Sequence, residues 1–382
     1  FWGDHYRYVY GTDIKVPIAT LDTLNGGYTI ERKGGGHQTR SLRLIDKTGR
    51  NFALRAVKKS AVQFLQTAVF LENYVEEEFK ETATENVLLD FYTSSHPYAS
   101  FTVGELADAI GVYHTNPLLI YVPKHTALGK YNEEFGDELY MIEERPDNDF
   151  LDVASFGKTD AIESTGDVLT KLRKDEKYQI DEPAFIKARL FDMLLGDWDR
   201  HQDQWRWSRF DISKDKKIYR PIPRDRDQAF SNYDGAFIDF LKLIMEPVRA
   251  FQEYDGELKD VKWINSAGVK LDRNFTQNST KEDWLAQAKF IQDNLSDAQI
   301  EAAFKKFPVE VQDATSESIK EKFKIRLGNL DDIASRYYDH LTKLVILTGT
   351  DKDDHFEITR NDGSTKIAIS RIVDNKILEP YR

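Results

Sequence analysis

The chain has 382 residues and a formal net charge of -12, with 65 Asp and Glu against 53 Lys and Arg. This acidic balance argues against a general nucleic-acid binder, which normally carries a basic stripe, so we expect no nucleic-acid partner. The absence of Cys excludes disulfides, thiolate catalysis and cysteine-ligated metal sites.

The first part of the chain, residues 1–145, is predicted to form a β-rich lobe. Apolar and polar residues alternate between turn-forming residues, a pattern typical of strands joined by hairpins. Strands are expected at 28–30, 41–45, 51–57, 117–122 and 138–143, and helices at 62–92 and 100–111.

The second part, residues 146–348, is predicted to be a larger and mainly helical lobe. Apolar residues recur there at helical spacing. Helices are expected at 183–195, 281–293 and 317–347. Residues 349–382 are predicted to form a C-terminal β-hairpin extension, because 361–363 read Asn-Asp-Gly between two alternating runs. The expected fold class is therefore α+β with two lobes.

A run of three glycines between the first two strands is a candidate anion site. Gly34, Gly35 and Gly36 carry no Cβ, so their backbone amides can approach a phosphate closely. An ordinary hairpin turn explains the same residues equally well. Arg55 on the third strand is placed to clamp phosphates, and Lys59 follows at the strand end, where a solvated cation is the simpler interpretation.

The first of two acidic clusters follows the helix expected to end at residue 195. An Asp-Arg-His triplet there can supply a base and a metal ligand from one tight loop. Asp199 is the candidate for orienting an attacking hydroxyl, with His201 beside it. Asp203 or Gln204 can offer an oxygen to a metal ion. The alternative is a loop held by structural ion pairs.

The second acidic cluster lies some twenty residues later. Asp225 and Asp227 alternate with Arg224 and Arg226, and the flanking apolar residues suggest the end of a short strand. A strand end is a usual position for a metal-binding Asp, although ion pairing alone explains the alternation. Carboxylates gathered from both clusters would repel one another unless a divalent cation or a phosphate-bearing ligand offset their repulsion.

These motifs, in this order, resemble the atypical protein-kinase-like fold of type II phosphatidylinositol 4-kinases, actin-fragmin kinase, HipA-like kinases and secretory-pathway kinases. Residues 199–204 resemble the catalytic loop, and residues 225–230 resemble the metal motif, with Asp225 in the metal position. Residues 52–55 resemble the strand that carries the kinase lysine. Glu143 opens a segment that resembles the hinge between the lobes.

The kinase resemblance implies ATP or another nucleoside triphosphate as cofactor, together with Mg²⁺ or Mn²⁺. It also implies phosphoryl transfer to an acceptor of unknown class: protein, lipid, sugar or small molecule. Two departures, Arg55 in place of Lys and Gln204 in place of Asn, favour the alternative of a catalytically inactive, pseudokinase-type binding module. Asp90 and Glu105 are both candidates for the acidic partner of Arg55. A metal-dependent phosphoesterase is a third hypothesis, without the His-rich ligand set such enzymes often use.

Nearly the whole chain also resembles an uncharacterised domain of large Bacteroidetes envelope proteins. Residues 34–43 and the two acidic clusters carry this resemblance. It implies a location in the cell envelope, in the periplasm or at the outer membrane, and a possible fusion to a membrane barrel. No apolar run in the chain approaches the roughly 20 residues of a membrane helix. Because the sequence opens on Phe1 rather than Met, we expect a domain of a longer protein.

Overall fold

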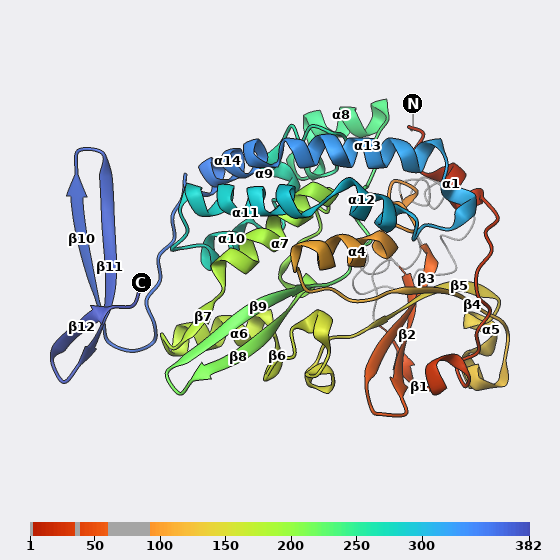
Figure 1. Cartoon of the computed structure of the whole chain (residues 1–382), viewed down its shortest axis with the longest axis horizontal. Helices are drawn as coiled ribbons and strands as arrows, with labels where there is room; N and C mark the ends of the chain where they lie inside the picture. The colour runs from red at the N-terminus through yellow and green to blue at the C-terminus, as the bar shows by residue number, and fades with distance from the viewer. Residues whose placement is uncertain (1–2, 35–38, 60–91) are drawn as a thin grey trace.

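A computed structural model describes residues 3–34, 39–59 and 92–382 of the chain (Figure 1). The expected α+β class is confirmed, with a β-rich N-terminal region, a mainly helical C-terminal region and a separate C-terminal sheet. The predicted boundaries after residues 145 and 348 stay predictions. Most of the helix expected at 62–92 lies outside the described residues. Within them, no helix combines the length and the apolar character that a membrane span needs.

The N-terminal sheet is antiparallel, with five strands in the order β1-β2-β3-β5-β4. Successive side chains point to opposite faces of a sheet. Leu42, Leu44 and Leu54 are fully buried on one face, where they form the core of this region. The opposite face is therefore free to carry polar side chains. The strands are β1 (Tyr28–Lys33), β2 (Thr39–Asp46), β3 (Asn51–Lys59), β4 (Leu118–Val122) and β5 (Glu138–Glu144).

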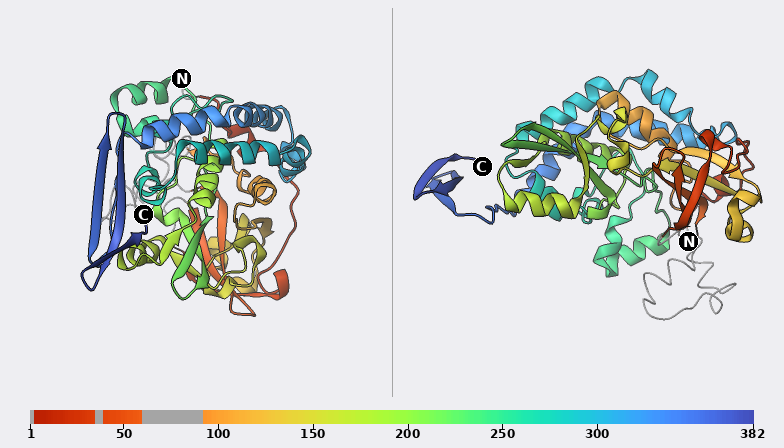
Figure 2. Two further views of the ribbon diagram at one scale, coloured as in Figure 1. Left: turned by 60° about the vertical axis from the view of Figure 1, so that its left-hand side comes forward. Right: turned by 90° about the horizontal axis from the view of Figure 1, so that it is seen from below.

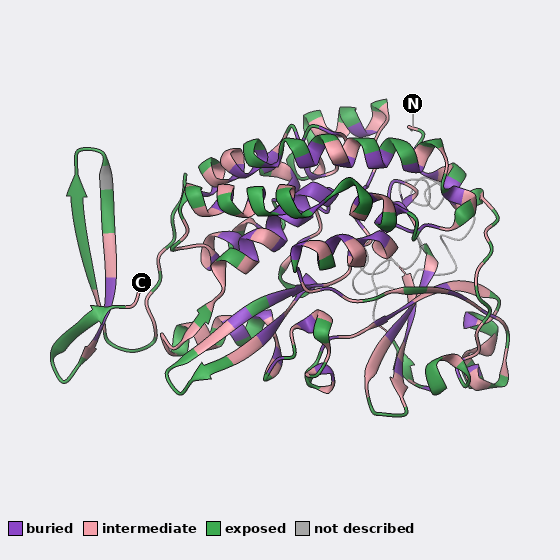
Figure 3. Cartoon of the chain, viewed as in Figure 1, coloured by how far each residue is buried: buried purple, intermediate pink, exposed green. Residues whose placement is uncertain are grey.

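The centre of the larger core is the helix α7 (Glu182–Leu195). Asp181 caps its N-terminus by accepting a hydrogen bond from the backbone N–H of Ala184, and Pro183 lies in its first turn. Gly196 ends the helix in the left-handed conformation, with φ at +72°. Figure 3 shows that most of α7 is buried. The loop that leaves Gly196 therefore starts from a rigid position.

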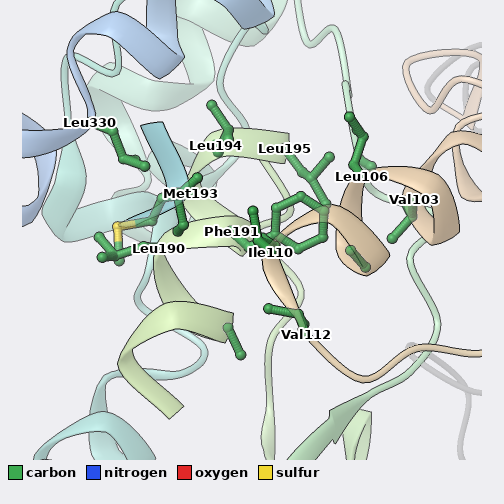
Figure 4. Packing of buried hydrophobic residues seen from close by; sticks show 14 of the residues in the cluster. Val103, Leu106, Ile110, Val112, Leu190, Phe191, Met193, Leu194, Leu195 and Leu330 are labelled. Carbon is green, nitrogen blue, oxygen red and sulfur yellow. The ribbon is translucent and has the colours of Figure 1, made fainter. Parts of the chain in front are cut away.

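The helix α4 (Ser100–Ile110) belongs to the first part of the sequence but packs against the helical region. Figure 4 shows its apolar side chains, together with Val112, facing those of α7. Val103, Leu106 and Ile110 are almost completely buried. This contact joins the N-terminal sheet to the helices.

Most of the remaining helices pack around α7, whereas the short helix at 132–135 packs against the N-terminal sheet (Figure 1). The segment predicted as one helix over 317–347 is two helices, because the chain breaks at Asn329 and helical structure ends at Leu341. The helices are α1 (Arg7–Gly11), α5 (Asn132–Phe135), α6 (Thr165–Lys174), α8 (Ala236–Ile244), α9 (Val261–Ile264), α10 (Val269–Phe275), α11 (Lys281–Asn294), α12 (Asp297–Phe304), α13 (Ala314–Gly328) and α14 (Leu330–Leu341).

A four-stranded middle sheet, in the order β6-β8-β9-β7, lies within the region expected to be mainly helical. Its centre is the hairpin of β8 and β9, where Trp205 and Trp207 alternate with polar residues and enter the core. No strand was expected at 205–213. The strands are β6 (Ala161–Ser164), β7 (Tyr178–Ile180), β8 (Trp205–Ser213) and β9 (Lys216–Pro223).

The C-terminal sheet has three antiparallel strands rather than the two of the predicted hairpin. The third strand follows a tight turn in which Asp374 and Asn375 both have positive φ, at +50° and +60°. Figure 2 shows this sheet standing away from the helices, and most of its side chains are exposed. Arg371 connects it to the rest of the chain through an ion pair with Glu176. The strands are β10 (Asp354–Asn361), β11 (Ser364–Val373) and β12 (Lys376–Pro380).

Candidate functional site

A cavity of about 320 Å³ lies between the N-terminal sheet and the two loops that follow α7 and β9. We call it the central cavity. It brings together residues that are 170 positions apart in the sequence and that come from three predicted motifs. The predicted site residues that line it are Arg55, Asp199, His201, Asp203, Gln204, Asp225 and Asp227.

Arg55 is the link between the N-terminal sheet and the second acidic loop. Its Nη1 atom lies 2.7 Å from Oδ1 of Asp225 and 3.0 Å from Oε1 of Glu143. Burial alone would lower the pKa of Arg55, but the two carboxylates raise it above its ordinary value. The guanidinium therefore remains charged across the range in which the protein is folded.

Glu143 lies on β5, directly beneath Arg55. Burial raises the pKa of its carboxyl, and the neighbouring Arg55 only partly opposes that effect. The Thr115 hydroxyl donates a hydrogen bond of 2.9 Å to the second oxygen of Glu143. The acidic partners of Arg55 are thus Glu143 and Asp225. Glu105 pairs instead with Lys306 at the surface, and Asp90 lies outside the described residues.

The arginine of the Asp-Arg-His triplet points inward and joins the two acidic loops. Arg200 donates from Nη1 to the backbone oxygen of Arg224, at 2.8 Å, and from Nη2 to that of Gln204, at 3.0 Å. Its Nη1 also lies 3.3 Å from Oδ2 of the buried Asp197. Removing this side chain would take away a hydrogen-bond donor from the backbone of each loop.

Arg226 makes the corresponding inward contact from the second loop. It forms an ion pair with Asp192 of α7 and lies 3.8 Å from Asp197. Burial raises the pKa of Asp197 to about 7, although Arg200 and Arg226 both act to lower it. We call Asp192, Asp197, Arg200 and Arg226 the inner group; the structural interpretation of the acidic clusters applies to these four residues.

The other carboxylates of the two loops, Asp199, Asp203, Asp225 and Asp227, line the central cavity. We call them the outer group. Burial raises the pKa of Asp199; His201 opposes this shift, whereas Asp227 adds to it. Burial thus makes Asp199 a stronger base than an ordinary carboxylate, as a proton acceptor requires.

His201 is oriented by the loop that contains it. Its Nδ1 accepts a hydrogen bond from the backbone N–H of Asp203, at 3.3 Å. This contact places the proton of the neutral ring on Nε2, which lies 3.8 Å from Oδ1 of Asp199. The ring therefore presents an N–H towards the Asp199 carboxylate.

The oxygens of Asp225, Asp227 and Gln204 are of the type that Mg²⁺ and Mn²⁺ prefer. Within the described part of the chain, however, no group of three His, Asp or Glu side chains is arranged to hold a metal ion. Asp225 has φ at +55°, a conformation that few residues other than Gly adopt, and its carboxylate is directed at Arg55. The donor set fits a divalent cation, and binding one would require Asp225 to share its charge between the metal and Arg55.

The glycine turn is described only at its first residue. The Gly34 N–H donates to the backbone oxygen of Ser41, and a Cβ on Gly34 would lie 2.1 Å from the Ser41 hydroxyl oxygen. A glycine is therefore required there for steric reasons. Gly35 and Gly36 lie outside the described residues. Lys59 ends β3 opposite Thr39, and its side chain is also outside the description.

Two arginines of the central cavity were not among the predicted site residues. Arg43 on β2 pairs with Ala53, so it shares a face with Arg55. Arg224 directly precedes Asp225 and also lines the cavity. Strand alternation would have identified Arg43 as a site residue if the register of β2 against β3 had been known.

No family model matches the chain, and no curated protein matches it. A crystal structure of a Helicobacter pylori proinflammatory kinase, CtkA, is similar to the chain with a TM-score of 0.41 and 14% sequence identity. The match covers 86% of this chain and 100% of that one. The resemblance to a domain of Bacteroidetes envelope proteins stays a prediction.

Proposed function

We propose that the central cavity binds a nucleoside triphosphate with Mg²⁺ or Mn²⁺, and that the chain transfers the terminal phosphoryl group to an acceptor hydroxyl. The observation that carries the proposal is the ion pair between Arg55 on β3 and Asp225 after β9, at the cavity that Asp199 also lines. In protein kinases a cation on the third strand holds the phosphates, and an Asp on a later loop holds the metal.

The division of roles follows from position and charge. Asp199 would orient the acceptor hydroxyl and take its proton, since burial raises the pKa of its carboxyl. His201, with Nε2–H directed at Asp199, would fix the orientation of that carboxylate. Asp225, Asp227 and Gln204 would hold the metal ion, which would neutralise phosphate charge when bound.

Arg55 supports this proposal despite standing where a kinase has Lys. A guanidinium has five N–H donors and can contact phosphate oxygens in pairs. The Nη1 atom of Arg55 contacts both Glu143 and Asp225. The Arg55 side chain can therefore keep its ion pair with Glu143 while its other N–H donors contact a phosphate.

The test is calorimetric titration of ATP into the chain, with Mg²⁺, with Mn²⁺ and with chelator, for wild type and Asp225→Asn. We expect metal-dependent binding that the substitution abolishes while the thermal unfolding midpoint is retained. Asp215→Asn is the matched control, because Asp215 is an exposed residue of the β8–β9 turn. Equal metal-dependent binding by Asp225→Asn and wild type would contradict the proposal.

A specific observation favours a second candidate, a nucleotide-binding module without turnover. Arg55 already neutralises Asp225, the carboxylate on which the metal site depends. Transfer of labelled γ-phosphate to water or to an added acceptor distinguishes the two candidates. Metal-dependent ATP binding without any release of ADP over hours would favour the binding module.

A further inference from the structure

The face of the N-terminal sheet that borders the central cavity is rich in arginine. Arg43 of β2 and Glu143 of β5 both pair with Ala53, so the two side chains lie on the same face. Arg55, two positions beyond Ala53, shares that face. The backbone N–H of Arg145 continues the ladder from β5 to β3, which places Arg145 on the same side as Glu143.

The middle sheet contributes two more arginines, Arg206 of β8 and Arg224, which follows β9. Trp205 and Trp207 enter the core on one face of β8, so Arg206 between them lies on the other. Arg224 extends the pairing beyond β9, because its N–H donates to the backbone oxygen of Gln204 at 2.9 Å. We call Arg43, Arg145, Arg206 and Arg224 the arginine cluster.

These side chains are close enough to repel one another. Burial and the charges of Arg145 and Arg55 lower the pKa of Arg43 to about 10. Burial and the charges of Arg206 and Arg55 lower the pKa of Arg224 to about 9. Burial and Arg145 also lower the pKa of Arg206. Arg43 and Arg224 thus add positive charge to the central cavity, which the outer group of carboxylates also lines, and Arg206 lines a separate hollow beside β6.

Within the described residues, these four arginines form no ion pair, unlike Arg55, Arg189 and Arg200. The Nε atoms of Arg43 and Arg145 are buried without a hydrogen-bond partner in the described part of the chain. The nearby carboxylates of Glu143 and Asp225 are engaged by Arg55. Buried polar groups without partners are rare and costly, so their occurrence here points to a ligand.

We propose that the arginine cluster is a metal-independent anion site that binds a polyphosphate chain, either free or as part of a nucleotide. Guanidinium groups match phosphate oxygens in shape and charge, and several of them suit a ligand with more than one phosphoryl group. Arg43 and Arg224 themselves line the central cavity. This site goes beyond the proposed phosphoryl transfer, because it requires neither a metal ion nor turnover.

The test is calorimetric titration of inorganic tripolyphosphate into the full chain in the presence of EDTA. We expect wild type to bind it and the double variant Arg43→Gln/Arg224→Gln to bind at least roughly tenfold more weakly, because each lost charged hydrogen bond contributes to the affinity. The double variant Arg173→Gln/Arg360→Gln, at two exposed arginines, is the matched control and should bind as wild type does.

Two further measurements distinguish a missing anion site from a loss of folding and from failure of the proposed kinase-like site. Without ligand, the Arg43→Gln/Arg224→Gln variant should unfold at a temperature no lower than wild type, because the substitutions remove repulsion. Asp225→Asn should still bind tripolyphosphate in EDTA even if it loses metal-dependent ATP binding. The anion site and the kinase-like site can therefore fail independently.

Titrations of ATP and adenosine in EDTA identify the source of the phosphate chain. Arginine-dependent binding of both ATP and tripolyphosphate, or of either alone, supports the site and shows whether the nucleoside is needed. Absence of binding by both phosphate compounds would overturn the proposal. Equal binding by wild type and the Arg43→Gln/Arg224→Gln variant would overturn it as well.

Discussion

Apart from Asp192 of α7, the inner and outer groups occupy the same two loops, and they differ in how their charges are balanced. In the inner group, Asp192 and Asp197 are paired with Arg200 and Arg226, and all four side chains are nearly or completely buried. In the outer group, four carboxylates border a cavity at which Arg55 is paired with Asp225. Neighbouring positions of one sequence motif therefore serve opposite purposes.

The difference shows how a short acidic motif can hold a loop in one conformation and still place charged side chains in a cavity. Buried ion pairs hold the two loops together at the cost of desolvation, and they leave alternate side chains pointing into the cavity. The structural interpretation of the clusters thus applies to the inner group, and the functional interpretation is our proposal for the outer group. Substitutions on the two sides should consequently have separable effects.

The largest expected effect is loss of stability when the inner group is broken. Arg226→Ala would leave the Asp192 carboxylate, which is fully buried, without one of its partners. We expect the free energy of unfolding to fall by about 3 kcal/mol, as when one member of a buried ion pair is removed. Urea unfolding measures this. Arg224→Ala, two residues away in the arginine cluster, is the control and should cause little loss; equal losses would contradict the comparison.

The largest effect expected on the outer side is on turnover. If the proposed phosphoryl transfer is correct, Asp199→Asn should lower kcat by about 10²–10⁴-fold, the usual contribution of a general base. Its unfolding midpoint should change little, because Asp199 borders the cavity. Steady-state release of ADP is the measurement, with Asp203→Asn as a control at a more exposed carboxylate. An unaltered kcat in Asp199→Asn would show that Asp199 is not the general base.

The pH dependence of stability provides a third test, at Asp197. Its carboxyl has a pKa of about 7 when folded because burial disfavours the charge, against about 4 when unfolded. Between these values the folded state binds more protons, so Asp197 contributes stability below about pH 4 that is lost as the pH rises through about 7. The slope from one such group is at most about 1.4 kcal/mol per pH unit.

Asp197→Asn should therefore flatten the fall in stability of wild type between about pH 4 and pH 7. Urea unfolding at several pH values measures the two curves. Asp215→Asn, at an exposed turn, should leave the curve of wild type unchanged. Parallel curves for wild type and Asp197→Asn would show that Asp197 keeps its charge when folded.

Local patterns in the sequence predicted much of this molecule. Alternation and turn residues placed the strands of the N-terminal sheet, including the position of Arg55 on β3. The acidic clusters were recognised because Asp and Arg are unusual next to apolar segments. These signals extend over a few residues, and they are therefore readable without a structure.

What the sequence could not supply depends on contacts between distant segments. The side of the loop on which Asp197 or Asp199 lies is decided by Arg200, which reaches the backbone of the second loop. The arginine cluster depends on the register between β2 and β3 and on the pairing of β8 with β9. The strand β8 was not predicted because it begins directly after the first acidic cluster, whose residues 199–204 were interpreted as a loop.

The smallest expected effect concerns the hydrogen bond that supports Glu143. Thr115→Val removes the hydroxyl that donates to Glu143 but leaves the contact between Glu143 and Arg55. We expect the free energy of unfolding to fall by about 1 kcal/mol, the usual contribution of one hydrogen bond. Thr115→Ser retains the hydroxyl and should stay close to wild type in the same urea titration.

This last substitution sharpens the comparison because Glu143 is buried like the inner group but belongs to the ion pairs of the cavity. Burial raises the pKa of Glu143, so the carboxyl can take up a proton when its support is weakened. In the inner group, Arg226→Ala would instead deprive the buried Asp192 carboxylate of a charged partner. A loss in Thr115→Val as large as that in Arg226→Ala would show that the cavity side is held as rigidly as the inner group.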